Sequence, residues 1–438
     1  MKVRKESSRV IKPLYEGNLP PSATNYIPLS VFDKVTYDAH IAIIYAYRPP
    51  NPPNLTLETG LRKALSVYRE WAGRLSKDDD GEPIILLNDA GVKFVEAYVD
   101  VKLDQVMPMK PSAFCLSLHP SLQGVDELVQ VQITRFNCGS MVVGFTAHHL
   151  VADGHATSNF LVAWGQACRG FEIHPLPLHD RAIFKPRNPP CFEFEHRGVE
   201  FKSQKLEKFP PLQDHDNVRG IEVDRVHFSL GFLAKLKSKA SSMNYNKKPY
   251  STFESLVAHL WKQVTKARGL SAYQKTKLKI SVNGRMRMSP RIPNEYFGNL
   301  VLWAFPASKV KDLLREPLPY GAKLIHETVE KVNDDYFTSF IDFASNQQVI
   351  KEENLVPTAD MNQAVECPNL EVSSWLRFPF YDLDFGGGSP YVFMPSYYPT
   401  EGTILLLPSF IGDGSIDAFI SLFEDHLAIF KQICYELD

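Results

Sequence analysis

Polar and apolar positions alternate over residues 129–134, where every second residue is valine or isoleucine. This period-two pattern predicts a half-buried strand. Residues 137–139 include asparagine and glycine, so we expect a turn there and a returning partner strand over residues 141–146. His149 then lies where a strand ends, and Asp153 stands where its side chain can cap the helix that follows.

The other periodic runs predict a mixed α/β chain. Short apolar or β-branched runs bounded by turn residues predict strands at 7–13, 39–47, 226–230, 278–282, 301–305, 370–378, 391–393 and 403–408. Apolar residues at helical spacing predict helices at 57–72, 157–168, 232–241, 251–264, 321–337 and 422–435. A second hairpin is expected from strands 84–87 and 92–99 around the turn sequence of residues 88–91. Because strands and helices mix in both halves, we expect two α/β domains.

A proline-rich segment separates the two halves. Residues 174–216 contain seven prolines and no sustained period, which is typical of a crossover linker. The predicted domains are therefore residues 1–173 and residues 217–438.

Composition excludes several classes of protein. With 438 residues, of which 44% are hydrophobic, the chain can bury large cores, and a net charge of −2 without a long basic run argues against a nucleic-acid partner. The six cysteines form no C-x-x-C pair and no metal-like spacing with histidine, so we expect reduced thiols and no metal. Residues 1–6 lack an apolar signal region, and no window reaches about 18 consecutive apolar residues, so a cytoplasmic protein without membrane contact is expected.

Two motifs carry the functional signal. His149 to Gly154 reads H-x-x-x-D-G, and Asp384 to Gly388 reads D-F-G-G-G. Taken alone, the adjacent histidines His148 and His149 are better explained as core residues with satisfied hydrogen bonds. Together, in this order and in a chain of this length, the two motifs resemble those of the plant BAHD acyltransferases, which transfer an acyl group from coenzyme A to an alcohol or amine. Residues 28–38 and 396–402 are most similar to the branch that acylates agmatine and putrescine.

The resemblance implies a fold and a set of roles. It implies two chloramphenicol-acetyltransferase-like domains with the active-site channel between them, and a monomer without a permanently bound cofactor. His149, with Asp153 four residues later, would be the general base, while Asp153 would pair with Arg285 to hold the site together. Asp384, Gly386 and Gly388 would have structural roles. Gly387 replaces a tryptophan that is usual in the family and is expected to leave extra room nearby.

Acyl-CoA is the expected co-substrate, and its phosphates need a local cationic site. Lys247 and Lys248 lie just before Ser251 and Thr252, at a predicted helix start where free N–H groups favour anions. Arg287 could add a charge-assisted contact. Without the resemblance, a solvated turn would be the preferred explanation of the two lysines.

The predicted strand at 370–378 is the candidate acceptor-binding element. Alternation would place Glu371, Ser373, Trp375 and Arg377 on one face, and in the family this strand lines the acceptor pocket. Glu371 is the first candidate to bind a cationic acceptor and Glu401 is the second, although each could be an ordinary surface glutamate. Arg377 would instead suit an acidic acceptor such as shikimate.

The resulting hypothesis is transfer of a hydroxycinnamoyl group, such as p-coumaroyl, from coenzyme A to agmatine or putrescine. No G-x-S-x-G or comparable nucleophile motif is present, so direct transfer in a ternary complex is favoured over an acyl-enzyme. The alternatives are an O-acyltransferase acting on shikimate or another alcohol, and an aromatic-amine acyltransferase acting on tryptamine or tyramine. A catalytically silent binding protein is disfavoured because both motifs are intact.

Overall fold

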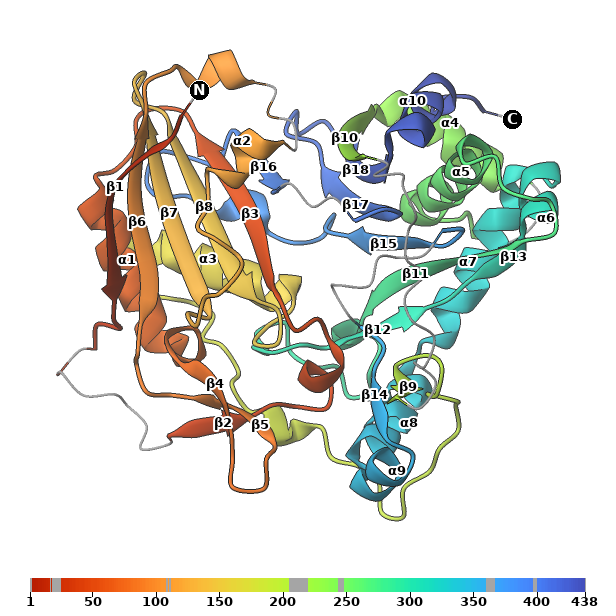
Figure 1. The fold of residues 1–438 in the computed structure, drawn as a ribbon, viewed down its shortest axis with the longest axis horizontal. Coiled ribbons are helices and arrows are strands. Elements are labelled where there is room, and N and C mark those ends of the chain that lie inside the picture. Colours follow the sequence, from red (N-terminus) through yellow and green to blue (C-terminus); the bar gives the residue numbers. More distant parts are fainter. Residues whose placement is uncertain are drawn as a thin grey trace.

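The computed structural model describes residues 2–15, 17, 25–107, 109, 112–204, 220–242, 248–359, 367–396 and 400–437. Within these ranges the chain forms two large mixed sheets, each with helices packed against it, and two smaller sheets (Figure 1). No helix in the described ranges has the length and apolar composition needed to cross a bilayer.

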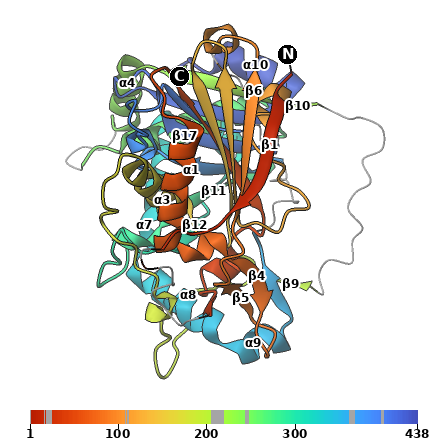
Figure 2. The same ribbon diagram turned by 90° about the vertical axis from the view of Figure 1, so that its left-hand side faces the viewer.

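The first large sheet has six strands and carries the predicted hairpin. Its order is β1 (Arg4–Ile11), β6 (Val92–Val99), β7 (Val129–Phe136), β8 (Met141–His148), β3 (His40–Tyr47) and β16 (Val392–Pro395). The antiparallel pairing of β7 with β8 confirms the first hairpin prediction. Helices α1 (Asn54–Val67) and α3 (Gly154–Cys168) lie along this sheet (Figure 2). The apolar face of α1 is buried, as its helical spacing predicted.

The second predicted hairpin is wrong. Strand β5 (Pro83–Leu86) pairs with β2 (Tyr26–Pro28) and β4 (Arg74–Lys77) in a separate three-stranded sheet. Strand β6 cannot pair with β5, because both of its edges are occupied by β1 and β7. The turn residues are still used as turn residues, since Asp89 and Gly91 have φ values of 50° and 93°.

The second large sheet faces the first and has its helices on the far side (Figure 1). Its order is β10 (Ile221–Phe228), β18 (Ile416–Phe423), β17 (Thr403–Pro408), β15 (Leu370–Ser374), β11 (Lys275–Asn283) and β12 (Val301–Ala304), with β13 (Ala307–Lys309) also paired to β11. The helices of this half are α4 (Leu230–Ala240), α5 (Thr252–Ala267), α6 (Val310–Arg315), α7 (Leu318–Lys331), α8 (Asp334–Ser345), α9 (Gln347–Glu352) and α10 (Glu424–Ile433). A second hydrophobic core lies between this sheet and helices α4, α5, α7 and α10, while α8 and α9 lie below the sheet in the view of Figure 1.

The helix predicted at 321–337 is two helices. Helix α7 ends at Lys331, and Asn333 caps the start of α8 by accepting a hydrogen bond from the backbone N–H of Tyr336. Asparagine is a strong N-cap residue, so a new helix begins where apolar periodicity alone predicted continuity.

The sheets do not divide at residue 217 as predicted. Strand β16, from the second half of the chain, pairs with β3 at the edge of the first sheet. The predicted linker is also more than a spacer, because β9 (Phe201–Ser203) pairs with β14 (Leu355–Pro357) and His196 is fully buried beside Glu200. Residues 205–216 of that linker lie outside the described residues.

The short helices of the first half are α2 (Ala113–Leu116), η1 (Asp33–Val35), η2 (Arg69–Ala72), η3 (Leu103–Val106) and η4 (Arg181–Ile183).

Candidate active site

His149 lies immediately after β8, where the Thr36 hydroxyl contacts one nitrogen of its ring. Its backbone N–H donates to Ala39 O at 2.9 Å, and its Nδ1 lies 3.1 Å from Thr36 Oγ1. With the Nδ1–H donating to that hydroxyl, Nε2 carries the lone pair, which is the tautomer a general base needs. Burial lowers the pKa of His149, although Asp153, Asn299 and Glu371 oppose the shift. The ring is therefore neutral near pH 7 and can accept a proton.

His148 has a different environment. It is directly opposite His40 in the β3–β8 pairing, and the two rings lie 4.7 Å apart. Burial, with smaller contributions from His40 and His149, lowers the pKa of His148 to about 3. A ring with so low a pKa is a poor proton acceptor near pH 7, and it packs against His40, so the structure favours a packing role for His148.

Asp153 is directed toward the second sheet and not toward His149. Arg285 Nη1 lies 2.7 Å from Asp153 Oδ2, and Nη2 lies 3.2 Å from Oδ1. The same carboxylate accepts the backbone N–H groups of Ala156, as the N-cap of α3, and of Leu300. Burial would raise the pKa of Asp153, but the charge and hydrogen bonds of Arg285 outweigh it and lower the pKa. The structure thus contains the pair that the sequence predicted, with both side chains in the interior.

A second interior network holds the histidine loop, and the sequence did not reveal it. Asn299 Nδ2 donates to His149 O at 2.9 Å and to Asp33 Oδ1 at 2.9 Å. Asp33 also binds Arg181, whose Nη2 donates to Val151 O at 2.7 Å. These contacts fix the backbone on both sides of Leu150. Their residues are far apart in sequence, so no local pattern connects them.

Tyr37 lies between the acceptor candidate Glu371 and His149, and it contacts both of them. The Tyr37 hydroxyl donates to Glu371 Oε1, and the Tyr37 ring lies 5.9 Å from the His149 ring, edge-on. Lys279 Nζ lies 3.6 Å from the same carboxylate oxygen. Neither Tyr37 nor Lys279 was predicted as a site residue from the sequence, because neither belongs to a motif of its own.

The rest of the predicted acceptor set is arranged differently. Strand β15 ends at Ser374, so the expected alternation does not extend to Trp375 or Arg377. The Trp375 ring packs against Phe380 and Phe393, and its Nε1 donates to Ser373 Oγ at 3.2 Å. Arg377 is exposed.

Glu401 has a structural partner. Arg268, at the end of α5, contacts Glu401 Oε1 with Nη2 at 2.6 Å and Nε at 3.1 Å, and both side chains are almost fully buried. This pair ties the segment before β17 to α5. It corrects the expectation for Glu401, whose carboxylate is already neutralised by Arg268 and is poorly placed to bind an acceptor.

The residues predicted to contact coenzyme A differ in their exposure and in the groups that they already bind. Ser251 caps α5 in a capping box with Glu254, whose Oε2 accepts the backbone N–H and the hydroxyl of Ser251 at 2.6 and 2.7 Å. These two Ser251 groups are therefore not free for a phosphate, which corrects the expectation for this residue. Thr252 opens the helix, Lys248 is exposed and Arg287 is half-buried. Lys247 lies outside the described residues.

The glycine-rich segment has the contacts of a structural turn. Asp384 Oδ1 accepts the backbone N–H groups of Gly386 and Gly388 at 2.7 and 2.8 Å, and those two glycines have φ values of 106° and 99°. Asp384 Oδ2 lies 3.3 Å from Arg169 at the end of α3. Only glycine adopts such φ values without strain.

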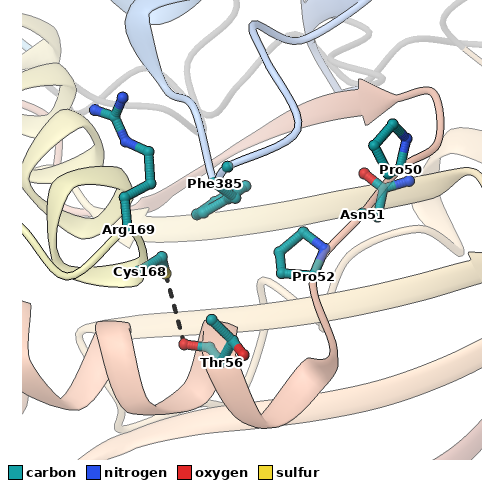
Figure 3. Close-up of a pocket in the computed structure, with 8 residues that line it drawn as sticks. Pro50, Asn51, Pro52, Thr56, Cys168, Arg169 and Phe385 are labelled. Atoms are coloured by element: carbon teal, nitrogen blue, oxygen red, sulfur yellow. Dashed lines mark hydrogen bonds between the residues drawn. The ribbon is translucent and has the colours of Figure 1, made fainter.

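Gly387 does not open space where its missing side chain would stand. A Cβ atom there would lie 2.1 Å from Pro50 O. A surface hollow of about 440 Å³ lies alongside, and its lining residues are Pro50, Asn51, Pro52, Thr56, Cys168, Arg169, Phe385 and Gly386 (Figure 3). Neither Gly387 nor His149 is among them, so this hollow is neither the extra room expected from the loss of tryptophan nor a space at the histidine.

Comparison with known proteins gives the family. The model of a family described as the transferase family matches residues 1–437. The chain is 51% identical to agmatine coumaroyltransferase-1 of Hordeum vulgare and 48% identical to putrescine hydroxycinnamoyltransferase of Oryza sativa subsp. japonica, in each case over 100% of both chains. The crystal structure of vinorine synthase is similar with a TM-score of 0.72 and 25% identity, over 98% of this chain and 96% of that one. The chain belongs to the BAHD family, has its α/β fold and is an acyltransferase.

Proposed function

We propose that this protein transfers a hydroxycinnamoyl group, such as p-coumaroyl, from coenzyme A to a primary amine of agmatine or putrescine. The observation that carries the proposal is the position of Glu371, whose carboxylate is linked through Tyr37 to the ring of His149. Agmatine and putrescine have a second cationic group, and a half-buried carboxylate near the base is the partner that such a group needs. The similarity to an agmatine and a putrescine acyltransferase supports the same acceptor class.

The proposed reaction requires one base and no covalent acyl-enzyme. His149 Nε2 takes a proton from the acceptor amine as the amine nitrogen attacks the thioester carbonyl carbon. The tetrahedral intermediate then collapses, the carbon–sulfur bond breaks, and the imidazolium returns the proton to the departing thiolate. The products are an amide and free coenzyme A. Asp153 contributes by holding the loop through Arg285 and does not accept the proton.

Coenzyme A is proposed to enter with its phosphates near the start of α5. Lys248 and the opening turn at Thr252 supply positive charge and helix-terminal N–H groups, and Arg287 is the remaining cation of the predicted set. Ser251 would hold the helix start in shape and not bind phosphate.

An acceptor panel tests the proposal. The protein is incubated with p-coumaroyl-CoA and agmatine, putrescine, tryptamine, tyramine or shikimate, and both free thiol and product mass are measured. Amides of agmatine or putrescine as the main products would support it. A shikimate ester as the main product would overturn the amine assignment.

An aromatic monoamine such as tryptamine is the second candidate acceptor. It is favoured by one observation, which is that Lys279 already stands beside Glu371. A carboxylate that has a cation of its own attracts a second cation less strongly.

A further inference from the structure

Lys279 is held in a cage built for a cation. Its Nζ lies 4.7 Å from the ring centroid of Tyr37 and 4.8 Å from that of Trp303. The same ammonium donates to the Tyr37 hydroxyl at 2.6 Å and lies 3.6 Å from Glu371 Oε1. Two aromatic rings and a carboxylate around an ammonium group are the elements of a site that recognises an organic cation.

The sheet register explains why these side chains meet. Lys279 is directly opposite Glu371 in the parallel pairing of β11 with β15, so the two side chains leave the same face of the second sheet. Trp303 leaves that face from β12, where it is opposite Ser281. Tyr37 reaches the cage from the chain between η1 and β3, next to His149. The cage therefore adjoins the base.

The cage and the proposed acceptor compete for one carboxylate. The lysine and glutamate side chains are only 18% and 16% exposed, so their charges are weakly screened by water. A cationic tail of the acceptor that approaches Glu371 must lie near the Lys279 ammonium and is repelled by it. Burial lowers the pKa of Lys279 while Glu371 opposes that shift, as expected for an ammonium that depends on this carboxylate.

We propose that Lys279 occupies, from within the protein, the site that would otherwise receive the distal cation of an amine acceptor, and thereby sets the preference between dicationic and monocationic acceptors. This inference deepens the proposed function and rests on its assignment of Glu371. It assigns Lys279, Tyr37 and Trp303 to one specificity site. Lys279 weakens the binding of agmatine or putrescine and leaves an uncharged-tail amine such as tryptamine unaffected.

The test is the ratio of kcat/KM for agmatine to kcat/KM for tryptamine, measured in the wild type and in Lys279→Met. Methionine keeps the length and apolar stem of lysine and removes the charge. We expect the ratio to rise about tenfold, the scale of one partly screened contact between like charges. Lys277→Met is the matched control, because Lys277 is exposed on the same strand and should leave the ratio unchanged. Since both rates come from one preparation, the ratio does not depend on the folded fraction.

The outcomes separate this inference from the proposed function. A wild type that acylates agmatine, with an unchanged or lower ratio in Lys279→Met, overturns the inference and leaves the proposed function standing. A wild type that uses only tryptamine, with agmatine activity gained in Lys279→Met, supports the inference and overturns the agmatine assignment. Where the methionine variant yields no folded protein, Lys279→Gln is measured in the same way, and the same change in ratio is required of it.

Discussion

Arg285 binds both carboxylate oxygens of Asp153 inside the protein, with contacts of 2.7 and 3.2 Å. The aspartate of the H-x-x-x-D motif is thereby joined to η6 (Gly284–Met286), which follows β11 of the second sheet. The motif thus contains one residue that we propose as the general base and one that connects the two halves of the molecule.

Asp153→Asn is expected to affect folding more than catalysis. Breaking a buried ion pair strands the remaining charge and costs roughly 3–5 kcal/mol of unfolding free energy. Urea unfolding measures this loss, and activity per folded molecule measures catalysis. Asp104→Asn is the control, because Asp104 is paired with Arg48 at the surface and should change the stability little. A stable but inactive Asp153→Asn would instead indicate that Asp153 acts directly on His149.

His149→Ala is expected to lower turnover by about 10²–10⁴-fold, the usual contribution of a general base. Binding of coenzyme A should persist, because the ring acts on the acceptor proton and not on the phosphates. Pre-steady-state acyl transfer and calorimetric titration with coenzyme A separate the two effects. The companion variant His148→Ala should keep most of its turnover per folded molecule. An active His149→Ala beside an inactive His148→Ala would reverse the assignment.

Stability is expected to fall as the pH falls below about 6.5, because His148 is buried in its neutral form. Its pKa is lowered from 6.5 to about 3 in the folded protein. Between these values the unfolded chain binds a proton that the folded chain does not, so acid favours unfolding. From pH 6.5 to about pH 5 this one residue should remove about 2 kcal/mol. Urea unfolding at several pH values tests it.

Two histidine replacements test whether His148 causes this pH effect, one at His148 itself and one at a control site. His148→Leu should flatten the dependence of stability on pH, while replacing the exposed His174 by glutamine should not. An equal slope in the wild type and His148→Leu would mean that His148 is not the buried neutral group responsible.

Glu371→Gln is expected to raise KM for agmatine and to leave KM for the acyl-CoA unchanged. Hydrogen bonds to charged groups contribute about 1.5–3 kcal/mol, and glutamine keeps the shape but not the charge. Steady-state kinetics with agmatine and with tryptamine measure the difference, which should be small for tryptamine. Glu401→Gln is the control. Because Glu401 is paired with Arg268, its variant should lose stability without discriminating between acceptors. Equal losses on both acceptors for Glu371→Gln would point to damage of β15.

Sequence patterns predicted the parts of the fold that are local. The β7–β8 hairpin and the cap of α3 by Asp153 depend on residues that are close in the sequence. The alternation of polar and apolar residues predicts the first, and the capping preference of aspartate predicts the second. The hairpin expected around residues 88–91 failed for a nonlocal reason, because β1 and β7 compete for both edges of β6. Strand β16 joined the first sheet for the same kind of reason.

The candidate site divides in the same way. His149 and the pairing of Asp153 with Arg285 were predicted from the motifs and the family resemblance. Tyr37 and Lys279, in contrast, are brought to Glu371 only by the register of β11 with β15 and by the path of the chain before β3. Glu401 shows the opposite case. Its sequence context was compatible with acceptor binding, and only the position of Arg268 at the end of α5 shows that its charge is already neutralised.

A competition assay tests the central claim most directly. Wild-type protein and His149→Ala each receive p-coumaroyl-CoA with equimolar agmatine, putrescine, tryptamine and shikimate in one vessel, and the products are quantified by mass. We expect amides of agmatine or putrescine to dominate with the wild type and to be nearly absent with His149→Ala. A dominant shikimate ester or tryptamine amide, or equal agmatine amide from both proteins, would contradict it.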